Sequence, residues 1–373
     1  MNFTVSSTTL GGCLQALSRV LNSKNSLPIL DSFLFEVANN ALTVTASDGD
    51  NVMKSTVELV ESDSDFSFCL ISKTIIEAVK EFSEEPLVFE VNNIDMSVTI
   101  RYHNGKNRIP FQPAELFPRI ENDEASMTSI AISASSLEKA ISRSIFAVAQ
   151  DDLRPVMNGL FFDLKTDNLT IVASDGHKLV RNENYAVVGN EPASFILPKK
   201  PATLLKTLLP KDGDVSFLFN AGTAIVKFAN YVLSCRLIDG KFPNYNSVIP
   251  QFNPFEVTID RQMLLSAIKR VLVFAPQNSY LVRFSLEPNK LVLSSEDADS
   301  ATSATEELSC DYNGQNMSIG FKGISFVEIL NNTSSQEVVL RLADPSRAGV
   351  IVPAEQEEND DLLMLIMPML LND

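Results

Sequence analysis

Alternating apolar and polar positions open the chain and are followed at once by a helical stripe. Phe3 and Val5 predict one face of a short strand, and the four leucines of Leu10–Leu21 follow at i, i+3, i+4 spacing. Serine and threonine residues stand before this stripe as candidate N-caps. Alternation returns at Leu42–Thr45 and Ser55–Leu59, where we predict strands.

The same order of elements recurs in the residues that follow. A strand at Phe66–Phe68 leads to a helix predicted over Lys73–Phe82, and further strands are predicted at Leu87–Val91 and Met96–Tyr102. The first third of the chain therefore consists of a strand, a helix and strands, twice. Two helices on one face of antiparallel sheet are expected, which places the chain in the α+β class.

Sliding the chain against itself by 127 residues reveals an internal repeat. The shift places Ala46–Gly49 on Ala173–Gly176, two copies of Ala-Ser-Asp-Gly, with no gap across about forty residues. A second shift of the same size places Ile130–Ile132 on Val257–Ile259. Three copies of about 124 residues fill the chain. We expect three domains, with bounds at 1–125, 126–252 and 253–373.

The charges are divided between the predicted helices and the remainder of the chain. The net charge is −17, and a uniformly acidic protein repels nucleic acid. The six predicted helices nevertheless hold thirteen basic and four acidic residues, so the rest of the chain carries −26. One interpretation is that lysine and arginine merely favour helices and solvated faces. The other is a basic surface, shared by six equivalent helices, that contacts the phosphates of a polyanion without reading its sequence.

Membrane and metal-binding classes lack the patterns they require. The longest apolar run, Leu362–Leu371, is about half as long as a bilayer span, and the opening residues lack the basic start and apolar stretch of a signal peptide. We therefore expect a cytoplasmic protein without a membrane partner. The four cysteines are widely separated and form no C-x-x-C pair, so we expect neither a metal nor another cofactor.

Catalytic motifs are absent as well. The sequence contains none of the loops G-x-x-x-x-G-K-[ST], G-x-G-x-x-G or G-x-S-x-G. Ser174, Asp175 and His177 lie within four consecutive residues, whereas triad members converge from distant segments. The first copy repeats Ser47–Gly49 without a histidine, which favours a structural turn. We expect a non-catalytic protein that encircles nucleic acid; the alternative is a protein-binding scaffold module without DNA encirclement.

Several segments, in a fixed order along the threefold repeat, match a known family over essentially the whole chain. They are Met1–Val5, Leu27–Leu30, Asn158–Phe162, Ala173–Leu179, Asp239–Tyr245 and Ile366–Met369. On these segments the chain resembles the β subunit of bacterial DNA polymerase III, the family of replication sliding clamps. The resemblance implies three tandem copies of a DNA-clamp domain, which close as a head-to-tail homodimeric ring around double-stranded DNA. Helices line the hole of such a ring and sheets form its outside. The partners implied are the replicative DNA polymerase catalytic subunit, the clamp loader, repair polymerases and other proteins with a clamp-binding peptide.

The basic helices and the resemblance together give candidate DNA-binding and dimer residues. We expect these cations to face the hole: Arg19, Lys24, Lys139, Arg143, Lys199, Lys200, Lys206, Arg261, Lys269 and Arg270. Lys24 is included because related clamps have a basic loop residue at that place. The predicted first helix of the third copy ends at Val271–Phe274, where related clamps bury apolar residues against the other subunit. Val273 and Phe274 are the candidate interface residues, and core packing stays open for Val271 and Leu272.

The resemblance also implies a peptide-binding site. The residues at matching positions are Met157, Ser174, Gly176, His177, Lys178, Leu179, Pro243, Val248, Ser346, Leu365, Ile366, Met367, Pro368 and Met369. The site is expected where the Gly176–Leu179 turn of the middle copy meets the end of the third copy. Its floor is expected to be apolar, with polar contacts from Ser174 and His177; the floor residues are Leu179, Val248, Leu365, Ile366 and Met367. Pro368 suits the end of an edge strand. Leu370 stands where the family often has arginine, and Ser247 where some members have one, so the rim is less basic. The acidic run Glu355–Asp361 is expected to be a solvated loop.

Overall fold

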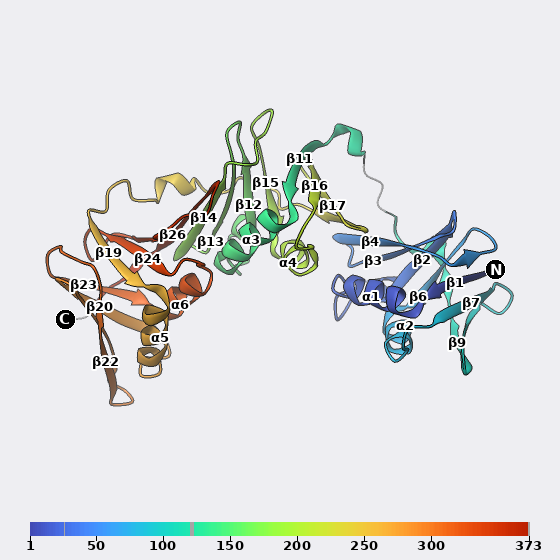
Figure 1. Ribbon diagram of the computed structural model, residues 1–373, viewed down its shortest axis with the longest axis horizontal. Helices are drawn as coiled ribbons and strands as arrows, with labels where there is room; N and C mark the ends of the chain where they lie inside the picture. Colours follow the sequence, from blue (N-terminus) through green and yellow to red (C-terminus); the bar gives the residue numbers. More distant parts are fainter. Residues whose placement is uncertain (26, 120–122, 372–373) are drawn as a thin grey trace. The chain divides into compact units, whose positions relative to one another are not determined.

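The computed structural model of the chain describes residues 1–25, 27–119 and 123–371 (Figure 1). Contacts divide the chain into two compact units, Met1–Leu137 with Thr203–Leu237, and Glu138–Ala202 with Ile238–Asp373. Within the described residues, six α-helices accompany four sheets whose strands pair antiparallel. The α+β class with antiparallel sheets is confirmed.

The first copy follows the predicted order of strand, helix and three strands, twice. Its first half is β1 (Asn2–Ser6), α1 (Ser7–Ser18), β2 (Ser32–Ala38), β3 (Ala41–Ser47) and β4 (Asn51–Glu58). Its second half is β6 (Phe66–Ile71), α2 (Ser72–Val79), β7 (Pro86–Asn92), β8 (Ser97–Tyr102) and β9 (Gly105–Pro110). The two-residue strands β5 (Glu61–Ser62) and β10 (Gln112–Pro113) are additions.

The second copy has the same two halves. They are β11 (Thr128–Ser133), α3 (Ala134–Ser144), β12 (Gly159–Leu164), β13 (Leu169–Ser174) and β14 (Lys178–Asn184), then β15 (Ala193–Pro198), α4 (Lys199–Leu208), β16 (Asp214–Phe219), β17 (Thr223–Phe228) and β18 (Tyr231–Arg236).

The third copy repeats the pattern once more and adds one short strand. Its elements are β19 (Phe255–Asp260), α5 (Arg261–Leu272), β20 (Leu281–Glu287), β21 (Lys290–Asp297) and β22 (Thr302–Ser309), then β23 (Met317–Lys322), α6 (Gly323–Asn331), β24 (Glu337–Leu342), β25 (Gly349–Pro353), β26 (Asp360–Ile366) and β27 (Pro368–Met369).

Two of the four sheets are shared between neighbouring copies. In the first unit, the nine-stranded sheet β10-β6-β2-β3-β4-β18-β17-β16-β11 joins the first copy to the second through the β4–β18 pair. In the second unit, the eight-stranded sheet β15-β12-β13-β14-β26-β25-β24-β19 joins the second copy to the third through β14–β26. The remaining sheets, β5-β1-β7-β8-β9 and β22-β21-β20-β23-β27, belong to single copies. Because strands of different copies share sheets, the compact units do not coincide with the copies.

The helices cover the sheets with the apolar faces that the sequence predicts. Leu10, Leu14 and Leu17 of α1 are buried, and α1 packs beside α2, as α5 packs beside α6 (Figure 1). The prediction that α1 reaches Leu21 is wrong by one turn, because the amide of Leu21 donates to the carbonyl of Ser18 in a tightened i→i−3 turn. Another such turn, from Phe82 to Val79, ends α2 early.

The cysteines behave as apolar side chains. Cys13, Cys69 and Cys235 are buried free thiols and Cys310 is half-buried. Burial raises the pKa of Cys69 to about 12. In residues 1–25, 27–119 and 123–371, no helix has the length and apolarity needed to cross a bilayer.

Candidate functional site

The pair β14–β26 brings together two segments that lie far apart in the sequence. Leu179 stands directly opposite Leu365, and Ser174 on the adjacent strand stands opposite Leu179. Residues paired in this way share one face of a sheet. The predicted meeting of the middle copy with the end of the third is therefore confirmed, and it takes the form of one continuous sheet.

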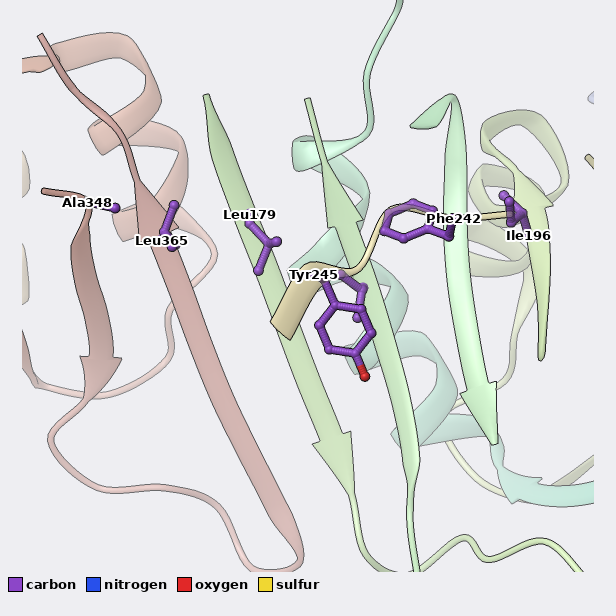
Figure 2. Close-up of a cluster of buried hydrophobic side chains, with 7 residues drawn as sticks. Leu179, Ile196, Phe242, Tyr245, Ala348 and Leu365 are labelled. Atoms are coloured by element: carbon purple, nitrogen blue, oxygen red, sulfur yellow. The ribbon is translucent and has the colours of Figure 1, made fainter. Parts of the chain in front are cut away.

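A cluster of buried side chains covers this face. Val172, Leu179, Ile196, Phe242, Tyr245, Ala348 and Leu365 form it. Figure 2 shows Phe242 and Tyr245 on a segment that runs from beside the strand carrying Leu179 toward Ile196, on the side away from Leu365. The rings of Phe161 and Phe242 stack with centroids 4.8 Å apart. The Asp-Gly-Lys-Phe-Pro-Asn-Tyr segment is thus fixed to the sheet by its aromatic side chains.

Tyr245 is also held by a polar contact. Its hydroxyl donates to Oδ2 of Asp163 at 2.9 Å. Burial, together with this carboxylate, raises the pKa of Tyr245 to about 12. The phenol therefore stays protonated and acts as a donor at neutral pH.

The expected floor of the peptide site is wrong for Ile366, and Lys178 likewise lies elsewhere. Both residues are one position along from Leu365 and Leu179, and side chains alternate between the faces of a strand. Ile366 is 1% exposed, and Nζ of Lys178 lies 3.2 Å from Glu328 of α6. These two side chains belong to the helix-covered face of the sheet.

Exposed apolar side chains lie beside the cluster. Val248 is 54% exposed, and Met367 is 41% exposed while its amide donates to the carbonyl of His177 at 2.8 Å. Pro243 and His177 are exposed, and Met157 is buried. Of the expected floor, Leu179 and Leu365 belong to the buried cluster, and Val248 and Met367 are open to solvent.

The end of the chain leaves the shared sheet at Met367. Pro368 and Met369 form β27, which pairs with β23 at the edge of the five-stranded sheet. The expectation that Pro368 suits an edge strand is confirmed, since proline cannot donate to a further neighbour. Ser346 lies in an exposed turn two residues before Ala348 of the cluster, and its amide and hydroxyl both donate to Asp344.

The Asp-Gly turn between β13 and β14 is held by its own polar groups. Oδ1 of Asp175 accepts the amides of His177 and Lys178 at 2.8 and 2.9 Å, and Gly176 has φ +88°, which favours glycine. The hydroxyl of Ser174 accepts from the amide of Gly176 and donates to the carbonyl of Lys178. Ser174 therefore supports the turn through its hydroxyl. His177 is the exposed polar side chain of this turn.

Arg154 is a residue of this region that the sequence reasoning missed. Its Nη2 donates to the carbonyl of Asp175 at 3.2 Å, and Nη1 lies 2.7 Å from where a Cβ on Gly176 would stand. A pair with Asp151 orients the guanidinium, which is half-exposed beside the turn. The repeat contained a signal for this residue. Pro155 aligns with Pro28, so Arg154 stands where the first copy has the apolar Leu27, and a charged residue replaces an apolar one.

The candidate DNA-binding cations fall into two groups. Arg19, Lys24, Lys206 and Lys269 are exposed, and Lys199 and Lys200 are half-exposed. Several contact other groups of the chain, among them Lys139 with Glu357, Arg143 with Glu357 and Asp360, Arg261 with the carbonyls of Leu330 and Ser335, and Arg270 with Glu306. The expectation that the charge of Arg143 faces a hole is wrong. This side chain is only 8% exposed, and its guanidinium pairs with the carboxylates of Glu357 and Asp360 inside the chain.

The helices keep a basic excess with their true bounds. They contain nine basic and three acidic residues. Arg19, Lys80, Lys211 and Lys322 lie just outside them, because the helices are shorter than predicted. Glu355–Asp361 is not simply a solvated loop, since Glu357 and Asp360 neutralise cations of α3.

The residues at the end of α5 differ in their exposure, and Leu272 is half-buried. Val271 is 1% exposed and belongs to the core of its own copy. Val273 is 76% exposed and Phe274 is 40% exposed. Two apolar side chains therefore face solvent directly after a helix that packs on β22.

Comparisons with known proteins converge on one family. Models of the DNA polymerase III beta subunit match along the chain: the N-terminal domain at residues 1–121, the central domain at 131–244 and the C-terminal domain at 246–370. The beta sliding clamp of Pseudomonas putida is 26% identical over 371 residues, covering 99% of this chain and 100% of that protein. That of Treponema pallidum is 27% identical over 372 residues, covering 95% and 96%.

Solved structures agree with these relatives. A sliding clamp (DNA polymerase III subunit beta) from Pseudomonas aeruginosa, bound to griselimycin, superposes with a TM-score of 0.94 at 25% identity and full coverage of both chains. The DNA polymerase III beta subunit of Thermotoga maritima gives a TM-score of 0.90 at 26% identity, again with full coverage.

The charge of Asp175 makes the turn sensitive to acid. Burial raises the pKa of this carboxyl, but hydrogen bonds from Lys178 and His177 outweigh burial and hold it below its ordinary value. A carboxyl with a lowered folded pKa stabilises the fold above its unfolded pKa of about 4, and this contribution is lost as the pH falls through the folded pKa. We expect Asp175→Asn to cost about 1–2 kcal/mol at pH 7, and less below about pH 4.

Urea unfolding between pH 7 and pH 3 measures this difference. Asp152→Asn is the matched control, since Asp152 is exposed on a nearby loop and forms no ion pair among the described residues. A cost for Asp175→Asn that stayed constant down to pH 3 would contradict the role of the charge.

Proposed function

Because the chain belongs to the DNA polymerase III beta subunit family, we propose that two copies join head to tail into a ring around duplex DNA. The chain is a sliding clamp, a processivity factor of DNA replication and not an enzyme. The ring would tether the replicative polymerase to its template in the cytoplasm. We take the copies 1–125, 126–252 and 253–373 as its domains. The observation on which this proposal rests is that β9 of the first copy and β22 of the third are edge strands of their sheets.

The internal junctions indicate how such a ring closes. Each junction pairs the third strand after the first helix of one copy with the third strand after the second helix of the next copy. These pairs are β4 with β18, and β14 with β26. By the same rule β22 of the third copy requires β9 of a first copy. Both strands are edges of their sheets in this chain. An unpaired edge is a template for another strand, so two chains can satisfy each other twice and close.

Charge and apolar surface at the two edges support the same pairing. β9 carries Lys106 and Arg108, and β22 carries Glu306 and Glu307. Within the chain, Arg108 pairs with Asp95, Glu306 with Arg270 and Glu307 with Lys290, so these pairs would be shared with the second subunit. Strands of opposite charge attract and fix their register. Phe274, exposed at the end of the helix that packs on β22, supplies an apolar contact for the neighbouring subunit.

The exposed cations support contact with DNA. Arg19, Lys24, Lys199, Lys200, Lys206 and Lys269 are the side chains we assign to the hole. Contacts of this kind go to phosphates, carry no sequence information and let a protein slide. The acidic remainder of the chain repels DNA from other surfaces.

The cluster on the shared sheet supports peptide binding. We propose that a short peptide of the polymerase catalytic subunit, the clamp loader or another partner binds beside this cluster, in which Leu179 and Leu365 are buried. Val248, Met367 and Pro243 would contact its apolar side chains, and His177 its polar ones. Methionine and other flexible apolar side chains accommodate several partners.

The first prediction concerns ring closure. The wild-type protein should sediment at twice the chain mass of 41.0 kDa. Phe274→Asp should give folded monomers, because a charge at the apolar contact opposes pairing. Val188→Asp, at a residue of the middle copy that is 57% exposed, is the control and should stay dimeric. Sedimentation velocity distinguishes the two, and a dimeric Phe274→Asp protein would show that the interface lies elsewhere.

The second prediction concerns DNA. Replacing Lys199, Lys200 and Lys206 by Glu should shorten retention on nicked circular DNA by about tenfold or more at moderate salt, since each phosphate contact adds to the salt dependence. Reversing Lys54 and Arg236, exposed cations outside the helices, should leave retention unchanged. Retention by the helix variant at the wild-type level would favour a scaffold without DNA encirclement.

The third prediction concerns the peptide site. Val248→Glu and Met367→Glu should each weaken binding of a polymerase-tail peptide by about fivefold or more, because apolar anchors contribute about 1 kcal/mol or more each. Val188→Glu is matched to Val248 in type and exposure and should bind normally. Calorimetry measures the affinity, and equal affinities for all three variants would place the site on another surface.

A further inference from the structure

The acidic segment Glu355–Asp361, a loop that leads into the first two residues of β26, contacts helix α3 through two acidic side chains. Oε2 of Glu357 lies 3.0 Å from Nζ of Lys139, and Oε1 contacts the guanidinium of Arg143. Oδ2 of Asp360 lies 3.4 Å from Nη1 of Arg143. These contacts lie within one compact unit, and they join the second copy to the third beside the shared sheet.

The two carboxylates differ in their access to water. The side chains of Arg143 and Asp360 are 9% and 12% exposed, and Asn184 donates to the second oxygen of Asp360 at 2.9 Å. This inner pair is a fixed part of the junction between the copies. The side chains of Lys139 and Glu357 are 48% and 38% exposed. An exposed ion pair of this kind is weak and exchanges readily with other ions.

Glu357 is well supplied with donors, so it is charged at neutral pH. Ser334 donates to Oε1 at 3.1 Å in addition to the two cations. Burial raises the pKa of Glu357, but the hydrogen bond from Lys139 and the charges of Arg143 and Lys139 outweigh it and hold that pKa below its ordinary value. The carboxylate therefore occupies Lys139 in the way that a phosphate would.

We propose that Glu357 is a built-in competitor of DNA phosphates for Lys139, so that the loop weakens the grip of α3 on the duplex. A phosphodiester oxygen must displace Oε2 of Glu357 before Lys139 can bind it. Arg143 remains with Asp360 and contributes structure. The inference rests on the proposed function, since it requires DNA to run along the basic helices.

Neutralising the competitor tests the idea in the full-length dimer. Glu357→Gln keeps the shape of the side chain and removes its charge, and it should tighten binding to a labelled DNA duplex by about two- to fivefold at moderate salt. Because one more lysine becomes available, the slope of log K against log salt should become steeper by about 0.9. Fluorescence anisotropy over a range of salt concentrations measures both quantities.

Two further variants separate competition from general charge. Glu358→Gln removes the same charge from an exposed neighbour that has no ion pair within the described part of the chain, and it should change binding little. In a Lys139→Ala background, Glu357→Gln should lose its effect, because the cation that it releases is gone. Equal tightening by Glu357→Gln and Glu358→Gln, or a gain that survives Lys139→Ala, would overturn the proposal.

The outcomes also distinguish this inference from the proposed function. If the wild type binds DNA, and reversal of Lys199, Lys200 and Lys206 weakens that binding while Glu357→Gln matches the wild type, only the competitor is wrong. If no protein in the series binds duplex DNA, the proposed function fails and the competitor fails with it. Sedimentation of each variant verifies that the dimer is intact.

Discussion

Backbone pairing between neighbouring copies is the interaction on which the rest of the structure depends. The β4–β18 and β14–β26 ladders turn three similar copies into continuous sheets. A strand edge left in water exposes a row of unpaired donors and acceptors, so each copy requires its neighbour. The second of these ladders also sets Leu179 opposite Leu365, and it thereby builds the floor of the candidate peptide site. The proposed assembly and the proposed peptide site would thus depend on one kind of contact.

Much of the fold could be predicted from the sequence because the repeat supplies the same evidence three times. The Asp-Gly pairs at Asp48 and Asp175 each place a carboxylate where it accepts amides of the following turn, so the repeated Ala-Ser-Asp-Gly motif has the same local structure in both copies. The ends of helices were harder to predict. Leu21 continues the apolar stripe of α1, but the backbone has already tightened, and periodicity cannot distinguish a last helical turn from an i→i−3 turn.

The candidate site was predictable in its segments and less so in its side chains. Resemblance placed Leu179 and Leu365 in one region, yet it also placed Ile366 and Lys178 there, which lie on the opposite face because strands alternate. Arg143 looked like a free cation until its distant partners Glu357 and Asp360 came beside it. Charge counting identifies which residues are basic. Only the fold decides which of them are neutralised by acids more than two hundred positions away.

The free edges of the two end sheets have a consequence for direction. In each of these sheets one edge is a two-residue strand, β5 or β27, and the other is the longer β9 or β22. The two long edges differ from one another, so a second chain can pair with the first only head to tail, with β9 of one chain against β22 of the other. A ring made of two such chains has its twofold axis along the hole, and every surface feature appears twice on the same side. Both peptide sites would then look along the DNA in one direction, and the ring would have a front and a back.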